Sequence, residues 1–450
     1  MTIETASTRI SSWQRTLTAS RVTTAEGLPP GPRLPSALQS VLIWTQRQRF
    51  IPAMHRRYGD TFTVNAEPTG FGVVLRDPDD LRTIFRGDPE IFHAGEGNAL
   101  LAPLVGRRSV LTMDAPDHIE ERRRMLPPFH GERIARVVAL MEEETEREIA
   151  HWPIDQDFAL LPRMQALTLS IIVRVVLGVD EVDRAEAVGA ALRRVLEIRL
   201  RDMLLWVLPS LQRLRPWSNI VRDLDRADEL IYAEIARRRA DPARAERPDV
   251  LSMLLDGDPD PELVRDELVT LLVAGHETTA VALSWTFERL LRHSGALSKV
   301  QAGLDDPRDP YRAAVAKEAL RLRPVIMNIA RRLTQPVELA GHMMPAGTLL
   351  LPSIIGIHTD PKIWGPDAGY FRPERWLSGD QPTYAWIPFG GGARRCLGAT
   401  FALTEIDAVL RTVLRRNELR ADRPQDEKPR MHHITLVPSR GARVRVTAKT

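Results

Sequence analysis

The feature that most constrains the fold of this chain is an uninterrupted, largely apolar stretch, DELVTLLVAGHETTAVALSWTFERLLRH, at residues 266–293. Its apolar residues recur at helical spacing and cover most faces, which predicts one long helix that is buried on nearly all sides. The stretches 132–152 and 224–241 also carry apolar residues at helical spacing. We therefore expect a mainly helical protein.

Strand patterns are short and few. Residues 60–78 alternate apolar and polar side chains on both sides of a Pro/Gly break, as a β-hairpin does. A second group lies toward the C-terminus in 336–353 and 431–448, where the SRG of residues 439–441 predicts a hairpin turn. The expected fold class is mainly α with small antiparallel β-sheets (α+β).

The 450 residues divide into a flexible N-terminal tail, 1–27, and a single domain, 28–450. The chain is 43% hydrophobic and 27% charged, which suits a large core and an ordinary soluble surface. The tail is rich in Ser, Thr and Arg and poor in acids, so an organellar transit peptide is the alternative interpretation. The proline-rich LPPGPRLP at 28–35 predicts an extended lead-in to the domain.

Charge, apolar runs and cysteine content exclude several functional classes. A net charge of only +3 argues against nucleic-acid binding driven by bulk charge. Apolar runs such as LLWVLPSL are too short to span a bilayer, so we expect no membrane anchor. The single cysteine excludes an intramolecular disulfide framework and any multi-cysteine metal site, and it favours a reducing, cytoplasmic location.

That cysteine, Cys396, lies in the glycine-rich stretch FGGGARRCLG, residues 389–398. The glycines permit unusual backbone dihedrals and a close approach to a flat ligand. A helix is predicted directly after Cys396, and a helix N-terminus lowers the pKa of a thiol. Such a thiolate can be a nucleophile or a metal ligand, and haem iron accepts a single axial cysteine. Arg394 supplies a cation suited to a haem propionate.

The stretch resembles the haem-binding signature of the cytochrome P-450 family. The match holds at each fixed position of the signature, namely Phe389, Gly390, Gly392, Arg394, Cys396 and Gly398. The resemblance implies the fold of that family, with haem b between the long helix and the helix after the cysteine. It makes Cys396 the axial iron ligand and places Phe389, Gly390 and Gly398 among the haem contacts.

Two other segments of the family have a structural role. Glu318 and Arg321 are three residues apart in VAKEALRLRP and can form an ion pair on one helical face. The segment YFRPERWLSGD resembles the one whose arginine, here Arg375, joins that pair in a buried network behind the haem. Trp376 stands where phenylalanine is more usual in the family.

The long helix carries AGHETT, residues 274–279, where the resemblance places the chemistry. Glu277 and Thr278 match the family's acid–alcohol pair, with Glu277 delivering protons and Thr278 stabilising the reacting oxygen. Ala274 is expected against the haem, and Gly275 permits a local opening of the helix. The alternative is a threonine bonded back within the helix, with Glu277 at the surface. His276 is interpreted as structural.

Three further cations are assigned to the haem propionates. His118 and Arg122 are i and i+4 on one predicted helix, so both can face the same anionic group. Arg331 stands where the family has another propionate-binding arginine, and its neighbour Arg332 is expected to point away. Ordinary surface charges are the alternative for each.

The resemblance implies a haem-thiolate monooxygenase of the soluble bacterial type that activates dioxygen and inserts oxygen into a substrate. Segments matching the family's recognition loops are rich in apolar residues, which favours an apolar small-molecule substrate; they are 92–106, 199–211, the helix near Ala274, 325–330 and 432–436. A haem-thiolate gas or ligand sensor and an oxygen-independent rearrangement enzyme are the alternatives. The acid–alcohol pair speaks against a peroxide-using relative.

Electrons are expected from a separate ferredoxin and ferredoxin reductase, because no flavin-like or ferredoxin-like stretch follows Cys396. Arginines on the cysteine side of the haem would form a basic patch that attracts an acidic ferredoxin. The expected members of this patch are Arg123, Arg124, Arg395, Arg411, Arg415 and Arg416.

Overall fold

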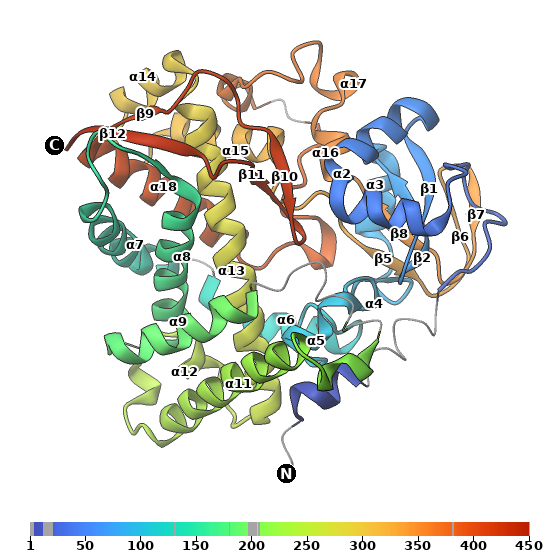
Figure 1. Ribbon diagram of the computed structural model, residues 1–450, viewed down its shortest axis with the longest axis horizontal. Helices are drawn as coiled ribbons and strands as arrows, with labels where there is room; N and C mark the ends of the chain where they lie inside the picture. The colour runs from blue at the N-terminus through green and yellow to red at the C-terminus, as the bar shows by residue number, and fades with distance from the viewer. Residues whose placement is uncertain are drawn as a thin grey trace.

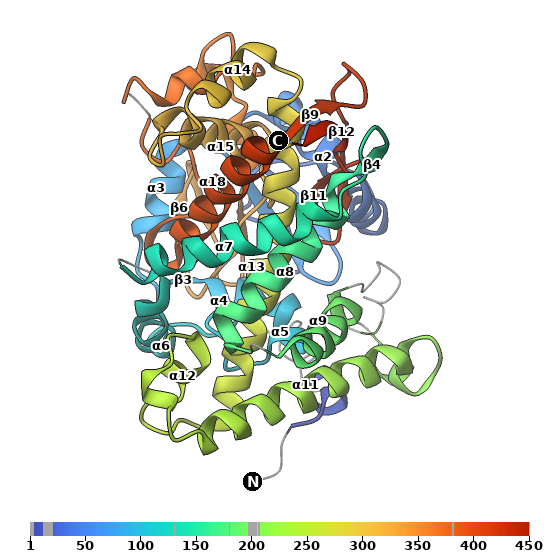
Figure 2. The same cartoon turned by 90° about the vertical axis from the view of Figure 1, so that its left-hand side faces the viewer.

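The computed structural model describes residues 4–11, 21–129, 132–179, 181–196, 205, 208–379 and 382–449. Helices dominate the structure, and the small sheets lie at its margins (Figures 1 and 2). This agrees with the predicted fold class. The helices of the first half are α2 (Ser36–Tyr58), α3 (Pro78–Arg86), α4 (Ala94–Gly97), α5 (Ala102–Val105), α6 (Asp117–Met125), α7 (Glu132–Ala150), α8 (Leu160–Leu177), α9 (Val182–Leu196) and α11 (Trp217–Ala240). Those of the second half are α12 (Val250–Leu254), α13 (Pro261–Leu290), α14 (Ser294–Ala302), α15 (Pro310–Leu322), α16 (Ile354–His358), α17 (Pro361–Trp364) and α18 (Ala399–Arg416).

Helix α13 is the predicted long apolar helix, and it runs through the centre of the molecule beside α8 (Figure 1). It begins at Pro261, because the Asp260 side chain accepts a hydrogen bond from the Glu262 N–H and proline is favoured in the first turn. Most of its residues are buried, in the large apolar cluster that also takes in α8, α15 and α18. The periodicity of the sequence thus identified the central helix of the core.

Two helices, α8 and α13, are long and apolar enough by length and composition to cross a membrane. The rest of the protein buries 61% of the apolar window of α8 and 72% of that of α13. Both therefore serve as core helices of this fold.

The largest sheet has five strands in the order β1-β2-β8-β5-β3. Its strands are β1 (Thr61–Ala66), β2 (Gly70–Leu75), β3 (Phe92–His93), β5 (Arg331–Leu333) and β8 (Leu349–Pro352). The predicted hairpin at 60–78 is the antiparallel pair β1 and β2, with Thr61 opposite Leu75. One pair, β2 with β8, is parallel.

The remaining strands form three small antiparallel sheets, β10-β11, β4-β12-β9 and β6-β7. Their bounds are β4 (Asp157–Ala159), β6 (Val337–Leu339), β7 (His342–Met344), β9 (Asn417–Ala421), β10 (Pro429–His432), β11 (Thr435–Pro438) and β12 (Arg443–Lys449).

The predicted hairpin turn at 439–441 is wrong. Strand β11 pairs with β10, whereas β12 pairs with β4 and β9 in another sheet. Gly441 and Ala442 both have positive φ, 76° and 54°, and this left-handed stretch leads the chain from one sheet to the other. The tight turn lies earlier, between the paired residues His432 and Thr435, and His433 there has φ 54°.

Part of the stretch expected to be a flexible tail packs against the body of the protein. Residues 6–11 are helical, and Ala6 and Ile10 are fully buried. Residues 12–20, which complete most of that stretch, lie outside the described residues.

Candidate haem site

The cysteine loop is held by the backbone and by its contact with α3. The Cys396 N–H donates to the Phe389 carbonyl oxygen at 2.9 Å, which closes the loop ahead of α18. Gly392 has φ 64°, and a Cβ there would lie 1.9 Å from the carbonyl oxygen of Phe85. Both Gly390 and Gly392 have a positive φ that favours glycine, and Gly392 is required in addition by its packing on α3.

The thiol of Cys396 is accessible, although protein surrounds the residue closely. This crowding raises the pKa of the thiol, and the Gly398 N–H and the charges of Arg122 and Arg395 oppose the rise only in part. The expected lowering of the thiol pKa by the helix start is thus not the net result for the protein alone. A bound metal cation would supply the missing positive charge, since a coordinating thiol loses its proton outright.

Four basic side chains meet beside the loop, those of His118, Arg122, Arg331 and Arg394. His118 on α6 and Arg331 on β5 are 1% and 4% exposed. Burial, together with repulsion from Arg394, Arg122 and Arg331, lowers the pKa of His118 to about 3. Burial, together with Arg394, lowers the pKa of Arg331 to about 10. Both pKa values are lowered because the groups are buried close to one another and little negative charge lies near them.

The partners of these cations differ. The Nδ1 atom of His118 is buried and has no hydrogen-bond partner within the described part of the chain. Arg331 donates to the carbonyl oxygen of its neighbour Ala330 at 2.7 Å. Arg122 donates to the Arg395 carbonyl oxygen at 2.6 Å. All three donors could turn to an external anion without breaking an ion pair with a carboxylate in the described structure.

Arg394 is already bonded. It donates to the carbonyl oxygens of Val110, at 2.9 Å, and Met113, and it pairs with Asp114 Oδ1 at 2.9 Å. Asp114 also accepts the backbone N–H groups of Gly95 and Glu96 at 2.7 and 2.9 Å. Arg394 thus fixes the 110–114 segment beside the loop, and a propionate contact remains a prediction for it.

Haem fits this set of residues. Its two propionates would neutralise the arginines and accept from the buried His118 nitrogen that has no partner in the described residues, and its iron would meet the only thiol of the chain. Ala274 on α13 is exposed, whereas Leu272 and His276 on the same helix are buried. The long helix therefore offers one open position in an otherwise covered stretch.

The acid–alcohol pair lies next to that position on α13. The Thr278 hydroxyl donates to the Ala274 carbonyl oxygen at 2.6 Å, which is the back-bonding of the alternative interpretation. Glu277 is not at the surface, however, because its side chain is only 17% exposed. The structure therefore combines the back-bonded hydroxyl with a largely buried acid.

Glu277 is held by two residues far away in the sequence. Gln165 Nε2 on α8 donates to Glu277 Oε2 at 2.8 Å, and His432 Nδ1 lies 3.7 Å from Glu277 Oε1. Burial by itself raises the pKa of Glu277, but His432 and Gln165 outweigh it, and the net pKa lies below its ordinary value. The acid is therefore ionised at neutral pH and must gain a proton before it can deliver one.

Gly275 has a different role from the one expected. Helix α13 continues as a regular α-helix through this residue, with no local opening. A Cβ at position 275 would lie 2.9 Å from Ile172 Cδ1 on α8, so the glycine allows the two helices to approach closely. His276 is buried beside it with Nδ1 3.1 Å from Thr168 Oγ1, and burial lowers its pKa to about 4. This environment suits the structural role expected for His276.

The predicted network behind the haem is present and buried. Glu318 and Arg321 are both 0% exposed and form two hydrogen bonds of 2.8 Å, and Arg375 Nε donates to Glu318 Oε1 at 2.9 Å. Arg321 also donates to three backbone carbonyl oxygens, those of His358, Ala368 and Tyr370. These residues therefore form a buried network and not a solvated pair at the surface.

Sequence analysis missed the contribution of Trp376. Its indole N–H donates to Glu318 Oε2 at 2.9 Å, which a phenylalanine could not do. Gln165 and His432 were missed as partners of Glu277 as well, since no local spacing links them to it. Of these contacts, only that of Trp376 had a signal in the sequence, namely a tryptophan where the family usually has phenylalanine.

Most of the expected basic patch is paired with acids. Four of the six arginines contact a carboxylate within 3.2 Å, as follows: Arg124 with Glu121, Arg411 with Glu142, Arg415 with Asp305 and Arg416 with Glu146. Arg123 and Arg395 are exposed, and within the described ranges no carboxylate contacts either of them. The predicted patch is therefore much smaller than the arginine count suggested. Most of the 199–211 segment expected to contact substrate lies outside the described residues.

Comparisons with known proteins show the family of the chain. The family model "Cytochrome P450" matches residues 26–446. "Putative cytochrome P450 135B1" of Mycobacterium tuberculosis is 44% identical over 438 residues, covering 95% of this chain and 93% of the relative. "Putative cytochrome P450 135A1" of the same species is 39% identical, covering 95% and 96%. The "cytochrome P450DA heme domain" superposes with a TM-score of 0.81 at 23% identity, covering 94% of this chain and 98% of that one. The chain is a member of the cytochrome P450 family, whose cofactor is haem b.

Proposed function

We propose that this haem-thiolate monooxygenase oxidises an apolar small molecule, with Cys396 as the axial ligand and electrons from a separate ferredoxin and ferredoxin reductase. The single observation that carries the proposal is the group of basic side chains beside an accessible, unique thiol, in which His118 and Arg331 are buried and Arg122 is half-buried. When bound there, haem supplies the activation of dioxygen. The single cysteine supports a reducing, cytoplasmic setting.

Each cation has a defined task in this proposal. His118, Arg122 and Arg331 orient the haem by binding its propionates, whose negative charge offsets the repulsion between the arginines and raises the pKa of His118. The Cys396 N–H stays bonded to the Phe389 carbonyl oxygen, so the sulfur keeps its direction. The network of Glu318, Arg321 and Arg375 stiffens the segment that leads to the loop.

Proton movement follows a path through side chains of this chain. His432 is 41% exposed and can take a proton from water, and its Nδ1 faces Glu277 Oε1. Glu277 then holds the proton at the edge of the open position on α13, and the Thr278 hydroxyl exchanges its bond to the Ala274 carbonyl oxygen for one to the reacting oxygen. Gln165 keeps the carboxylate in place by its bond to Oε2.

The electron donor is assigned to the face that carries Arg123 and Arg395. Both are exposed cations close to the thiol loop, since Arg395 is next to Cys396 and Arg122 of the same helix bonds to its carbonyl oxygen. An acidic ferredoxin would be attracted to this face, more weakly as salt rises.

The deciding experiment uses the purified holoprotein with a ferredoxin and ferredoxin reductase. Compounds are first screened for displacement of the iron-bound water, seen as a Soret shift, and the hits are then tested for oxygen consumption and an oxygenated product. One oxygen atom from labelled dioxygen in the product supports the proposal. Haem reduction without oxygen incorporation for every binding compound would favour a sensor or a rearrangement enzyme.

A further inference from the structure

Residues 4–11 form an ordered segment packed on the far side of the molecule from the sheets, next to α11 and α5 in both views (Figures 1 and 2). Ala6 and Ile10 are 0% exposed and belong to an apolar cluster distinct from the main core. The buried members of this satellite cluster are Ala6, Ile10, Ala99, Ala102, Ala191, Val195, Leu205, Leu224 and Ala227. The N-terminal segment therefore helps to complete a small core of its own.

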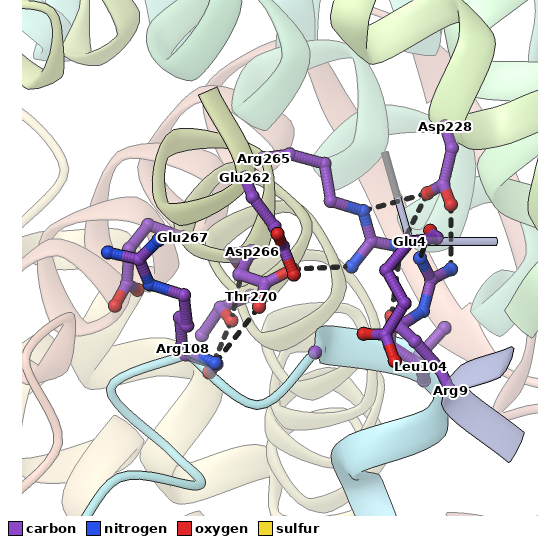
Figure 3. A network of polar contacts seen from close by, with 12 residues as sticks. Glu4, Arg9, Leu104, Arg108, Asp228, Glu262, Arg265, Asp266, Glu267 and Thr270 are labelled. Atoms are coloured by element: carbon purple, nitrogen blue, oxygen red, sulfur yellow. Dashed lines mark hydrogen bonds and ion pairs between the residues drawn. The ribbon is translucent and has the colours of Figure 1, made fainter. Parts of the chain in front are cut away.

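A buried charge network fastens the segment. Arg9 NH2 donates to Asp228 Oδ2 at 2.6 Å, and the two side chains are 4% and 9% exposed. Arg265 of α13 donates to the other oxygen of Asp228 at 2.8 and 2.5 Å, and it also pairs with Asp266 at 2.8 Å. Figure 3 shows both guanidinium groups converging on the Asp228 carboxylate. The two cations balance the two acids, so removal of Arg9 leaves the network one positive charge short.

Two weaker bonds extend the attachment along the chain. The Ala6 N–H donates to Asp225 Oδ1 at 3.0 Å, and the Ser7 hydroxyl donates to Gln212 Oε1 at 2.9 Å. Asp225 lies on α11 and Gln212 lies in the 3₁₀ turn just before it, at 209–213. The segment thus touches α11 and the chain that leads into it.

We propose that residues 4–11 act as a clasp that holds α9 and α11 against residues 99–105 and thereby limits how fast bulky ligands reach and leave the haem. This rests on the proposed function, because Ala99 and Ala102 belong to one segment expected to contact substrate and Leu205 to another. The satellite cluster joins these two segments, and Ala6 and Ile10 are packed within it. Separation of α11 from residues 99–105 breaks up this cluster. Any opening that releases Arg9 also leaves Asp228 Oδ2 without its arginine, although Arg265 still holds Oδ1.

The test compares the holoprotein with its Arg9→Gln variant. Arg21→Gln is the matched control, since Arg21 forms a pair of 2.9 Å with Glu67 that is 30% and 56% exposed. Amide hydrogen exchange is measured in α9 and α11, and stopped-flow absorbance gives the binding and release rates of 4-phenylimidazole and of carbon monoxide. In Arg9→Gln we expect exchange in α11 to rise at least tenfold. Both rates for 4-phenylimidazole should rise at least fivefold, while those for carbon monoxide change less than twofold.

A milder variant, Ser7→Ala, covers the case in which Arg9→Gln fails to fold, and it should shift exchange and 4-phenylimidazole rates in the same direction by about twofold. Exchange in α11 equal to that of Arg21→Gln would overturn the clasp. Faster exchange with unchanged 4-phenylimidazole rates would overturn its control of access. A failure of the proposed function would appear instead in the wild-type protein, as an absent thiolate spectrum, while the exchange measurement would still decide whether the clasp exists.

Discussion

Replacing Glu318 by glutamine should destabilise the protein far more than a surface substitution of the same kind. Glu318 accepts five hydrogen bonds on its two oxygens, from Arg321 (two), Arg375, the Arg372 N–H and Trp376. Glutamine removes the charge and turns one acceptor into a donor that faces other donors. Arg321 keeps its carbonyl acceptors but loses its only carboxylate in the described structure, and breaking a buried pair of this kind costs about 3–5 kcal/mol.

The assay is equilibrium unfolding of the holoprotein in urea, followed by far-ultraviolet circular dichroism and by the Soret band. With a slope of about 3 kcal/mol per molar for a chain of this size, the midpoint should fall by roughly 1–1.7 M. Glu374→Gln is the matched control. Glu374 is 42% exposed and its Oε1 accepts from Lys299 at 2.7 Å and from the Tyr311 hydroxyl at 2.8 Å. The amide oxygen of glutamine can keep both bonds, so the loss of charge should cost under about 1 kcal/mol.

Similar midpoints for Glu318→Gln and Glu374→Gln would refute the argument, because the buried network would then stabilise no more than a surface pair. Haem content is measured for each variant before unfolding. A Glu318→Gln protein that keeps full haem content and the wild-type midpoint would show that the two arginines are satisfied by backbone carbonyls alone.

Four further predictions concern the site. Ferrous wild-type protein with carbon monoxide should show the red-shifted Soret band of a thiolate ligand and Cys396→His should lose it; an unchanged band would remove Cys396 as ligand. Thr278→Ala should bind substrate normally but divert electrons to hydrogen peroxide or water, lowering product per electron by ~10-fold or more; full product yield would exclude a role for the hydroxyl. His432→Gln should raise the pKa of Glu277, because one contact that lowers it is lost. Infrared titration of the carboxyl band should then move to higher pH, whereas the control variant His342→Gln should leave it unchanged. In the wild type, the stability that this carboxylate contributes is fully present above its ordinary pKa of 4.5 and is lost as the pH falls through its lower folded-state pKa, and His432→Gln should reduce that contribution. Charge reversal at Arg123 or Arg395 should slow reduction by a fixed ferredoxin and weaken the salt dependence of the rate. Reversal at Arg416, which pairs with Glu146, should have a smaller effect. Equal effects at all three positions would place the docking face elsewhere.

Local patterns predicted the elements that depend on local forces. Helix α13 and the β1–β2 hairpin follow from apolar periodicity and turn residues, and Glu318 and Arg321 are neighbours on one helix. The failures all depended on which distant segments meet. The turn at 439–441 separates two sheets because β12 pairs with β9 and β4 rather than with β11.

The same reason explains the site residues that the sequence did not reveal. Arg411 and Arg416 appeared free until α7 placed Glu142 and Glu146 opposite them. Gln165 and His432 reach Glu277 from α8 and β10, and neither has a motif that connects it to the acid. The partners of charged side chains on different helices can thus be assigned only once the packing of those helices is known.

The contact between Gly275 and Ile172 has a consequence for anyone who engineers this protein. A glycine inside a helix costs about 1 kcal/mol relative to alanine, so routine thermostabilisation would choose Gly275→Ala early. Here the extra methyl group would lie 2.9 Å from Ile172 Cδ1, so either the Ile172 side chain must turn or α8 must move away from α13. Gln165 lies on α8 seven residues before Ile172, on the same face, and it would move away from Glu277 together with the helix. A substitution with no polar chemistry of its own would thus act on the Glu277 carboxylate through α8, and the overpacking at Ile172 would offset the stability that alanine normally adds to a helix.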